Sequence, residues 1–479
     1  MNKYIKILFI AFSLPSLLFS QDFDGQRLAE RDIQGTARYV AMGGAFSALG
    51  GDVSAVNDNP AALGIFRRGE LSVTADVRLD NVTTDGVFNG QDRRMTLPQL
   101  SWVMSFGSAD KQTGVIFNNI IIQYHRLKTY NRHSVFNPTL YTSQTDLMAE
   151  LSNGASEEMM QGSSGWTNKE IGWLTKAGYE GYLINPMAGN QWQSVYNTGE
   201  QVKTELEIYD GGVENEFTAG WGMNYSNRLY FGLTANVRSL NYSRQTQHTE
   251  HFLSGTTYQM LSAVAALGWG LNAAIGTIYR PTDYLKFGLS ISTPTVMYID
   301  FENYTEIKSN ANSLDGKYVE INSPRNHYSQ KLYEPMRLTA GIAFQIGYKA
   351  LISAEYDFDC KTSSQLYSTH TLKAGAEVSI NNHWFLRAGY ACQSAFSKKE
   401  WHYYPHFADT RTDTDYQNNR MVHYFNAGAG WHNKSWIVDI AYQCRWQNEN
   451  EYAYYKSSPM SLDALTHRIV LTFGWNYRL

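Results

Sequence analysis

The chain has 479 residues and a net charge of −4, which gives no reason to expect nucleic acid as a partner. Its 33 Tyr, 22 Phe and 12 Trp make it 14% aromatic, yet its mean hydropathy is −0.39. Beyond the N-terminus, no stretch approaches the ~20 apolar residues of a membrane helix. A negative mean does not exclude a membrane, because a transmembrane β-barrel alternates lipid-facing and lumen-facing residues and its average cancels.

Residues 1–20 have the pattern of a secretory signal peptide. Lys3 and Lys6 precede an apolar run at 7–14, and a Leu-Phe-Ser ending predicts cleavage after Ser20. Without these two lysines, the net charge of −4 becomes −6. The alternative is a buried N-terminal helix.

Residues 35–64, within an N-terminal segment of 21–68, are rich in glycine and alanine. Glycine pairs stand at 43–44 and 50–51, followed by Asn59, Pro60 and Ala61. The segment has too few large apolar residues for a core of its own and too many small ones for a flexible polar linker. It is therefore predicted to be a compact plug, or hatch, that is ordered only inside a larger enclosure.

Alternation with period two decides the fold class of residues 69–479. In the last segment, 466–479, the apolar residues share one parity and end in aromatics: Ile469, Leu471, Phe473, Trp475, Tyr477 and Leu479. Such segments are 11 to 18 residues long, whereas strands of soluble proteins are usually ~5–6 residues long. Tilted membrane strands with aromatic girdles need about the longer length.

About fourteen segments of this kind can be counted, an even number, as bacterial barrels require. They lie near 69–80, 95–108, 112–128, 213–226, 228–245, 268–280, 283–300, 334–346, 349–362, 370–381, 383–396, 420–432, 435–448 and 466–479. Short turns alternate with long loops, the longest at 129–212. The sequence predicts an all-β protein: a transmembrane antiparallel β-barrel with the hatch in its lumen, both termini in the periplasm and helix-bearing extracellular loops.

Two of the long loops are predicted to contain helices. In the longest, Thr167 and Glu170 form a capping-box pattern before Trp173 and Leu174, and a second segment holds Leu147, Met148 and Leu151. In the loop after the fifth strand, Met260, Leu261, Val264 and Leu267 recur at helical spacing. Trp173, Leu174, Met260, Leu261 and Val264 are predicted to line a hydrophobic ligand groove; the alternative is that they only pack the loops.

The third strand contains a change of parity. Val115 and Phe117 set one parity, and Ile120 and Ile122 follow on the other. A one-residue slip at Asn118–Asn119 is what a β-bulge produces, so these residues are predicted to mark a kink and a lateral opening. An ordinary irregularity near a strand end is the alternative.

The sequence resembles the FadL family of outer-membrane transporters for long-chain fatty acids and other hydrophobic compounds. The resemblance rests on the segments 35–38, 42–46, 48–52 and 59–64, in order before the first strand, and on 334–358. It implies the outer membrane of a Gram-negative bacterium and a fourteen-stranded barrel with a hatch motif at Asn59, Pro60 and Ala61. It also implies a kinked third strand that opens toward the membrane, and a first hydrophobic site on two extracellular loops.

The expected function is passive uptake of hydrophobic, fatty-acid-like molecules, with outer-membrane lipid around the barrel. Lumen-parity cations, Arg238, Lys373 and Arg387, are predicted to bind a carboxylate, although solvation or pairing with neighbouring acids is the alternative. No catalytic cluster, metal site or cofactor motif is found: Cys360, Cys392 and Cys444 have no zinc or redox spacing. A shuttle for a secreted protein partner and a haem-binding receptor remain alternative functions of FadL-like barrels.

Overall fold

The computed structural model describes residues 31–107, 113–162, 164–312, 317–360, 368–397, 401–406 and 408–478. The predicted signal peptide lies outside these residues. The described chain forms a closed antiparallel barrel of 14 strands, confirming the predicted fold class. The first and last strands close it, since β1 (Gly69–Thr84) pairs with β21 (Met460–Tyr477) from Gly69–Tyr477 to Thr84–Leu462.

Some strands of the wall are interrupted, so the sheet consists of more segments than the barrel has strands. The segments between β1 and β21 are β2 (Val87–Gly107), β3 (Val115–Thr129), β4 (Arg132–Phe136), β5 (Thr139–Leu140), β8 (Val202–Tyr225), β9 (Leu229–His251), β10 (Thr257–Tyr279), β11 (Leu285–Ser292), β12 (Thr295–Ser309), β13 (Val319–Asn322), β14 (Asn326–Glu334), β15 (Met336–Ile346), β16 (Ala350–Cys360), β17 (Thr369–Ser379), β18 (Trp384–Gln393), β19 (Tyr416–His432) and β20 (Trp436–Tyr452).

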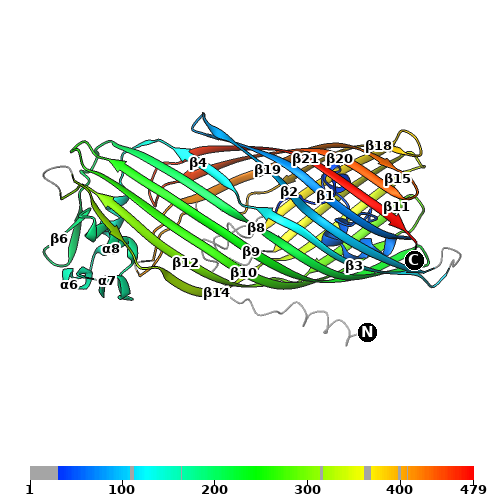
Figure 1. Ribbon diagram of the computed structural model, residues 1–479, viewed down its shortest axis with the longest axis horizontal. Coiled ribbons are helices and arrows are strands. Elements are labelled where there is room, and N and C mark those ends of the chain that lie inside the picture. The colour runs from blue at the N-terminus through cyan, green and yellow to red at the C-terminus, as the bar shows by residue number, and fades with distance from the viewer. Residues whose placement is uncertain are drawn as a thin grey trace, which may run out of the picture.

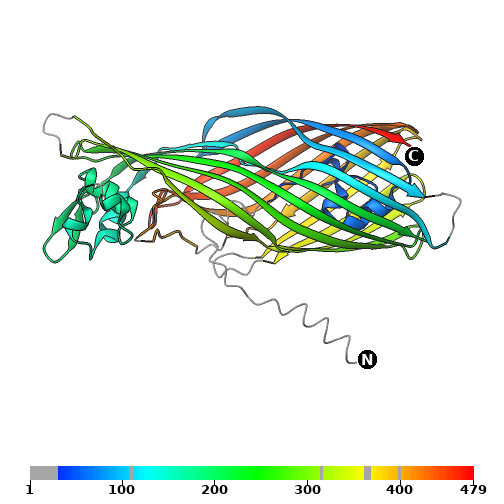
Figure 2. The same cartoon turned by 60° about the horizontal axis from the view of Figure 1, so that its bottom comes forward.

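The wall is much taller on one side than on the other. β8, β9 and β10 have 24, 23 and 23 residues, whereas β15 to β18 have 10 or 11. In Figure 1 the tall strands run out to the left, where they carry the extracellular helices, and the hatch lies inside the opposite end, near the C-terminus. Figure 2 shows the hatch enclosed by the wall from a second direction.

The outward side chains of β9 show where the membrane ends. From the short-turn end upward, they are Leu229, Phe231, Leu233, Ala235, Val237, Ser239, Asn241, Ser243, Gln245 and Gln247. The apolar half is the lipid-facing band of a transmembrane barrel, and the polar half stands above it in water. The tall side of the wall therefore continues beyond the membrane as an extracellular extension.

The described residues of the extracellular loop between β5 and β8 form four helices and a small hairpin. These are α5 (Gln144–Ser152), α6 (Glu157–Met160), α7 (Ser164–Thr167), α8 (Trp173–Glu180), β6 (Ile184–Met187) and β7 (Gln191–Ser194). Within the described residues, no helix combines the length and the apolar character needed to cross a membrane. The prediction of a helix around Leu147 and Met148 is confirmed by α5.

Two other predictions about the loops are wrong. Met260, Leu261, Val264 and Leu267 do not form a helix but belong to β10, which pairs with β9 over its whole length. Thr167 does not begin the helix that contains Trp173; it ends α7, and α8 starts after Gly172. The backbone N–H of Trp173 instead donates to the carbonyl of Asp409, 2.8 Å away on a distant loop.

Candidate functional site

The described part of the hatch, from residue 31 on, contains three short helices, and two tight glycine turns separate the first two. The helices are α3 (Ala37–Ala41), α4 (Ala55–Asp58) and the 3-10 helix η1 (Pro60–Ile65). The paired glycines at 43–44 and 50–51 have φ values of 66°, 77°, 61° and 70°. This left-handed region strains residues that carry a Cβ, which explains the glycine pairs seen in the sequence.

The Asn-Pro-Ala motif fixes the hatch to the wall. Asn59 Oδ1 accepts the backbone N–H of Ala61 at 3.0 Å and so caps η1, while Pro60 stands at a position where a helix needs no N–H. Asn59 Nδ2 donates to the carbonyls of Ser47 (2.7 Å) and Thr277 (3.1 Å), the latter on β10. The motif therefore joins two turns of the hatch to the barrel.

A belt of wall glycines lets the hatch backbone lie directly on the strands. Added Cβ atoms would meet hatch atoms at Gly222, Gly232, Gly276, Gly288, Gly341, Gly375 and Gly389. At Gly222, for example, a Cβ would stand 2.8 Å from Leu63 Cβ. Glycine inside a strand commonly marks such close approach. The hatch is thus packed against at least six strands, and the wall positions are shaped for it.

The third strand contacts the hatch through Asn119 but is not broken there. Asn119 is fully buried, and its Nδ2 donates to the carbonyls of Leu63 (2.7 Å) and Phe66 (2.9 Å). Asn118 and Asn119 pair with both β2 and β8, so the predicted opening at these residues is wrong. The register shifts lie instead between Val115 and Phe117 and between Arg126 and Lys128.

The wall is interrupted farther along, between β2 and β3. Their ladder runs from Gly107–Phe117 to Gln99–His125 and ends there. Above this point, the described part of β2 pairs only with β1 and that of β3 only with β8. The strands are joined again near the top, where Asn89 Nδ2 donates to the carbonyl of Val135 of β4 at 2.7 Å. We call the unpaired stretch, between residues 89–98 and 126–135, the seam.

The seam lies at the upper border of the lipid-facing band. Outward residues change from apolar to polar at Leu79–Asn81 on β1 and at Phe217–Asn215 on β8. Its rim on β2 carries Met95 and Leu97, which are 78% and 61% exposed. These large side chains lie at the lipid border, on a strand edge that lacks a partner. They give the wall an apolar surface at the seam, on the side of the membrane.

Two cavities in the lumen border the β3 side of the seam. One, of about 70 Å³, is lined by His125, Arg126 and Leu127 together with hatch residues such as Asn57. The other, of about 90 Å³, lies beside Lys128, Thr129 and Tyr130. Both are also lined by many charged side chains of other wall strands. The space behind the seam is therefore small and mainly polar.

The three predicted carboxylate-binding cations are already paired with acids of the wall. Arg238 contacts Glu214, Glu216 and Glu334. Lys373 Nζ lies 2.7 Å from Glu355, 2.8 Å from Asp357 and 3.5 Å from Asp58 of the hatch. These three acids are the only acidic cluster among the described residues with a spacing that could hold a metal ion. Arg387 binds Glu377 (2.6 Å) and Asp439 (2.5 Å). A ligand acid would have to displace one of these carboxylates.

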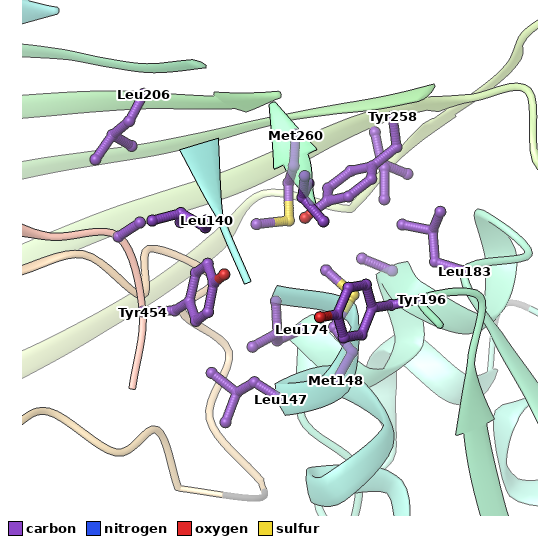
Figure 3. Close-up of a cluster of buried hydrophobic side chains, with 14 of the residues drawn as sticks. Leu140, Leu147, Met148, Leu174, Leu183, Tyr196, Leu206, Tyr258, Met260 and Tyr454 are labelled. Atoms are coloured by element: carbon purple, nitrogen blue, oxygen red, sulfur yellow. The ribbon is translucent and has the colours of Figure 1, made fainter. Parts of the chain in front are cut away.

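The five residues predicted to line one hydrophobic groove do not all lie together. Trp173, Leu174 and Met260 are 4%, 2% and 1% exposed and share one hydrophobic cluster beneath the extracellular helices, shown in Figure 3. Val264 belongs to a separate cluster inside the tall wall, and Leu261 has the outward parity of exposed Leu267. In Figure 3 Leu147, Met148 and Leu174 on the helices lie below Leu140 and Met260 on the strands, and all five belong to this cluster. The shared cluster is a packed core, which we call the cap core.

Comparison with solved structures places this architecture among known barrels. The chain resembles the Pseudomonas putida toluene transporter TodX, with a TM-score of 0.53 and 15% identity over 94% of this chain and 100% of that one. The fold is FadL-like. A Pseudomonas aeruginosa FadL homologue gives a TM-score of 0.54 at 11% identity, covering 94% and 99% of the two chains. The CymD monoaromatic hydrocarbon channel gives 0.51 at 9%, covering 93% and 98%.

At these identities the likeness establishes the FadL-like fold. No protein-family model matches the sequence, and no curated protein matches it.

Proposed function

We propose that this protein is an outer-membrane channel for passive uptake of hydrophobic small molecules. The seam between β2 and β3 carries the proposal, since it combines an apolar rim at the lipid border with lumen cavities directly behind it. A solute would pass through the wall at the seam, and the hatch would close the lumen below. The FadL-like fold supports the same class of function, because TodX and CymD are described as a toluene transporter and a hydrocarbon channel.

The charges of the lumen favour an uncharged solute. Arg238, Lys373 and Arg387 are buried and each is held by at least two carboxylates. Removing one partner from such a pair leaves a charge uncompensated in a medium of low dielectric constant, which costs about 3–5 kcal/mol. A neutral aromatic or aliphatic compound avoids this cost, whereas an ionised fatty acid does not.

Uptake of radiolabelled toluene by bacteria that lack their own hydrocarbon channel tests the proposal. Cells that produce the wild-type protein should accumulate the label faster than cells without it. Leu97→Asp, at the rim of the seam, should remove most of this gain, while Leu253→Asp, at an extracellular turn where the side chain is 79% exposed, should retain it. Equal accumulation with and without the wild-type protein would refute the proposal.

A second candidate function, the capture of a secreted protein, is favoured by the extracellular extension. β8, β9 and β12 rise above the lipid-facing band and carry a folded helical cap. Such a rigid platform suits a protein partner better than a small solute. A secreted protein that co-purifies with the wild type, in cells without toluene uptake, would support this role over transport.

A further inference from the structure

The short side of the barrel has an apolar groove on its lipid-facing surface. Its volume is about 500 Å³, and it is lined by Ala340, Ile342, Ala354, Tyr356, Leu372, Ala374 and Tyr390, together with the inward residues Gly341, Glu355 and Lys373. Alanines on three adjacent strands form the floor, because Ala354 stands opposite Ala374 and Ala340 opposite Tyr356 in the ladder. The larger side chains of Ile342, Tyr356 and Tyr390 stand around it.

A polar pair lies at the extracellular end of this groove. The hydroxyl of Tyr356 is 2.6 Å from Nδ1 of His370, the outward residue at the start of β17. A neutral ring that accepts the hydroxyl's hydrogen on Nδ1 carries its own hydrogen on Nε2, and a protonated ring carries hydrogens on both nitrogens. In both of these states Nε2 of His370 is a hydrogen-bond donor at the border between lipid and water.

The same pairing recurs on the next two hairpins. Tyr390 lies 2.8 Å from Nδ1 of His423, and Tyr442 lies 2.6 Å from Nδ1 of His467. Hydrogen-bonded strands are about 4.8 Å apart, so histidines on alternate strands stand roughly 10 Å from one another. This distance is too large for a shared metal ion, and the row instead offers separate donors to separate groups.

His133 is another outward histidine, but its ring has a different kind of neighbour from these three rings. The His133 ring nitrogen Nε2 lies 2.9 Å from Glu207, so a carboxylate of the protein itself occupies it. Among the described residues, the rings of His370, His423 and His467 contact tyrosine, phenylalanine and tryptophan side chains. On the same strands Lys373 and Arg468 are buried, and the nearest exposed charges are Arg420 on β19 and Asp463 on β21.

We propose that the groove and the Tyr356–His370 pair form a binding site for a phosphate-bearing membrane lipid. The acyl chain lies along the alanine floor, and His370 Nε2 donates to the phosphate at the lipid–water border. His423 and His467 extend the same contact to neighbouring lipids. A lipid fits this site better than a soluble phosphate, because His370 Nε2 lies at the end of the apolar groove and both face the bilayer.

Native mass spectrometry of the detergent-solubilised full chain tests this site with two probes of equal chain length. Phosphatidylglycerol should bind in a discrete complex, and diacylglycerol, which lacks the phosphate, should bind more weakly. His370→Phe keeps an aromatic ring but removes the donor, and should weaken phosphatidylglycerol binding about tenfold, as expected when one charge-assisted hydrogen bond is lost. Ala374→Phe should fill the groove and weaken both lipids.

Ala235→Phe is the matched control, since Ala235 is an outward, exposed alanine on β9, away from the groove. It should bind both lipids as the wild type does. A shift between heated and unheated gel samples confirms folding of each variant, and Ala354→Leu replaces Ala374→Phe if the latter does not fold. Unchanged lipid binding by the folded groove variant would overturn the site. So would equal binding of the two lipids by the wild type, or phosphatidylglycerol binding by His370→Phe that matches the wild type.

Discussion

Asn119 holds the end of the hatch to the third strand, because its side-chain amide lies 2.7 Å from the carbonyl oxygen of Leu63 and donates to it. The same amide reaches Phe66, so a single wall residue binds both sides of the hatch's last turn. Since Asn119 is fully buried, water cannot replace these bonds when the side chain is removed.

We therefore expect Asn119→Ala to loosen the hatch and to destabilise the folded protein by about 1–3 kcal/mol, the cost of removing a buried hydrogen-bond donor from its acceptors. The temperature at which the folded gel band disappears should fall, and liposomes should swell faster in small sugars. Asn118→Ala is the control, because Asn118 is only half-buried. Identical behaviour of the two variants would mean that the contact does not hold the hatch.

Gly232→Ala should displace the hatch from the inside of β9. A Cβ at this position would collide with the backbone of Pro60 and Ala61, which cannot move like a flexible side chain. Overpacking of this kind costs about 1–3 kcal/mol. At Gly474 the nearest atom to a new Cβ is Ile437 Cβ at 3.2 Å, so Gly474→Ala should be close to wild type in thermal stability and swelling. A wild-type response from Gly232→Ala would contradict the glycine belt.

The barrel could be predicted from the sequence because alternation with period two depends only on which side chains face lipid. The helix predicted at Met260 and Val264 shows the limit of such patterns. Residues four apart lie on one face of a helix and also on one face of a strand, so their spacing fits both structures. Only the pairing of β10 with β9 decides between them.

The seam was missed although the sequence contains a signal for it. Pro98 lies within β2, where it cannot donate a ladder hydrogen bond, and proline is confined to strand edges or bulges. The outward parity also changes there, from Leu100 to Leu97. The slip predicted in β3 is real, but side-chain parity placed it at Asn118–Asn119, whereas the register shift is nearer Ile116. Bulges are defined by backbone pairing, which depends on the partner strand.

Deletion of residues 31–64 should convert the protein into an open pore. The hatch occupies the lumen between the glycine belt and the charged wall, and without it the remaining barrel has a polar, water-filled interior. Liposome swelling in small sugars should become faster than with the full chain. A folded deletion variant with unchanged swelling would show that the segment does not close the lumen.

Leu174→Ala distinguishes a packed cap core from a ligand groove. Leu174 is 2% exposed and surrounded by the cap core, so its truncation should destabilise the cap by about 2–5 kcal/mol. Proteases added to intact cells should then cleave the extracellular loop faster, while Glu170→Ala, at an exposed position, should leave cleavage unchanged. Toluene uptake should be retained, because the proposed route enters at the seam. Loss of uptake with normal protease resistance would instead assign Leu174 to a solute groove.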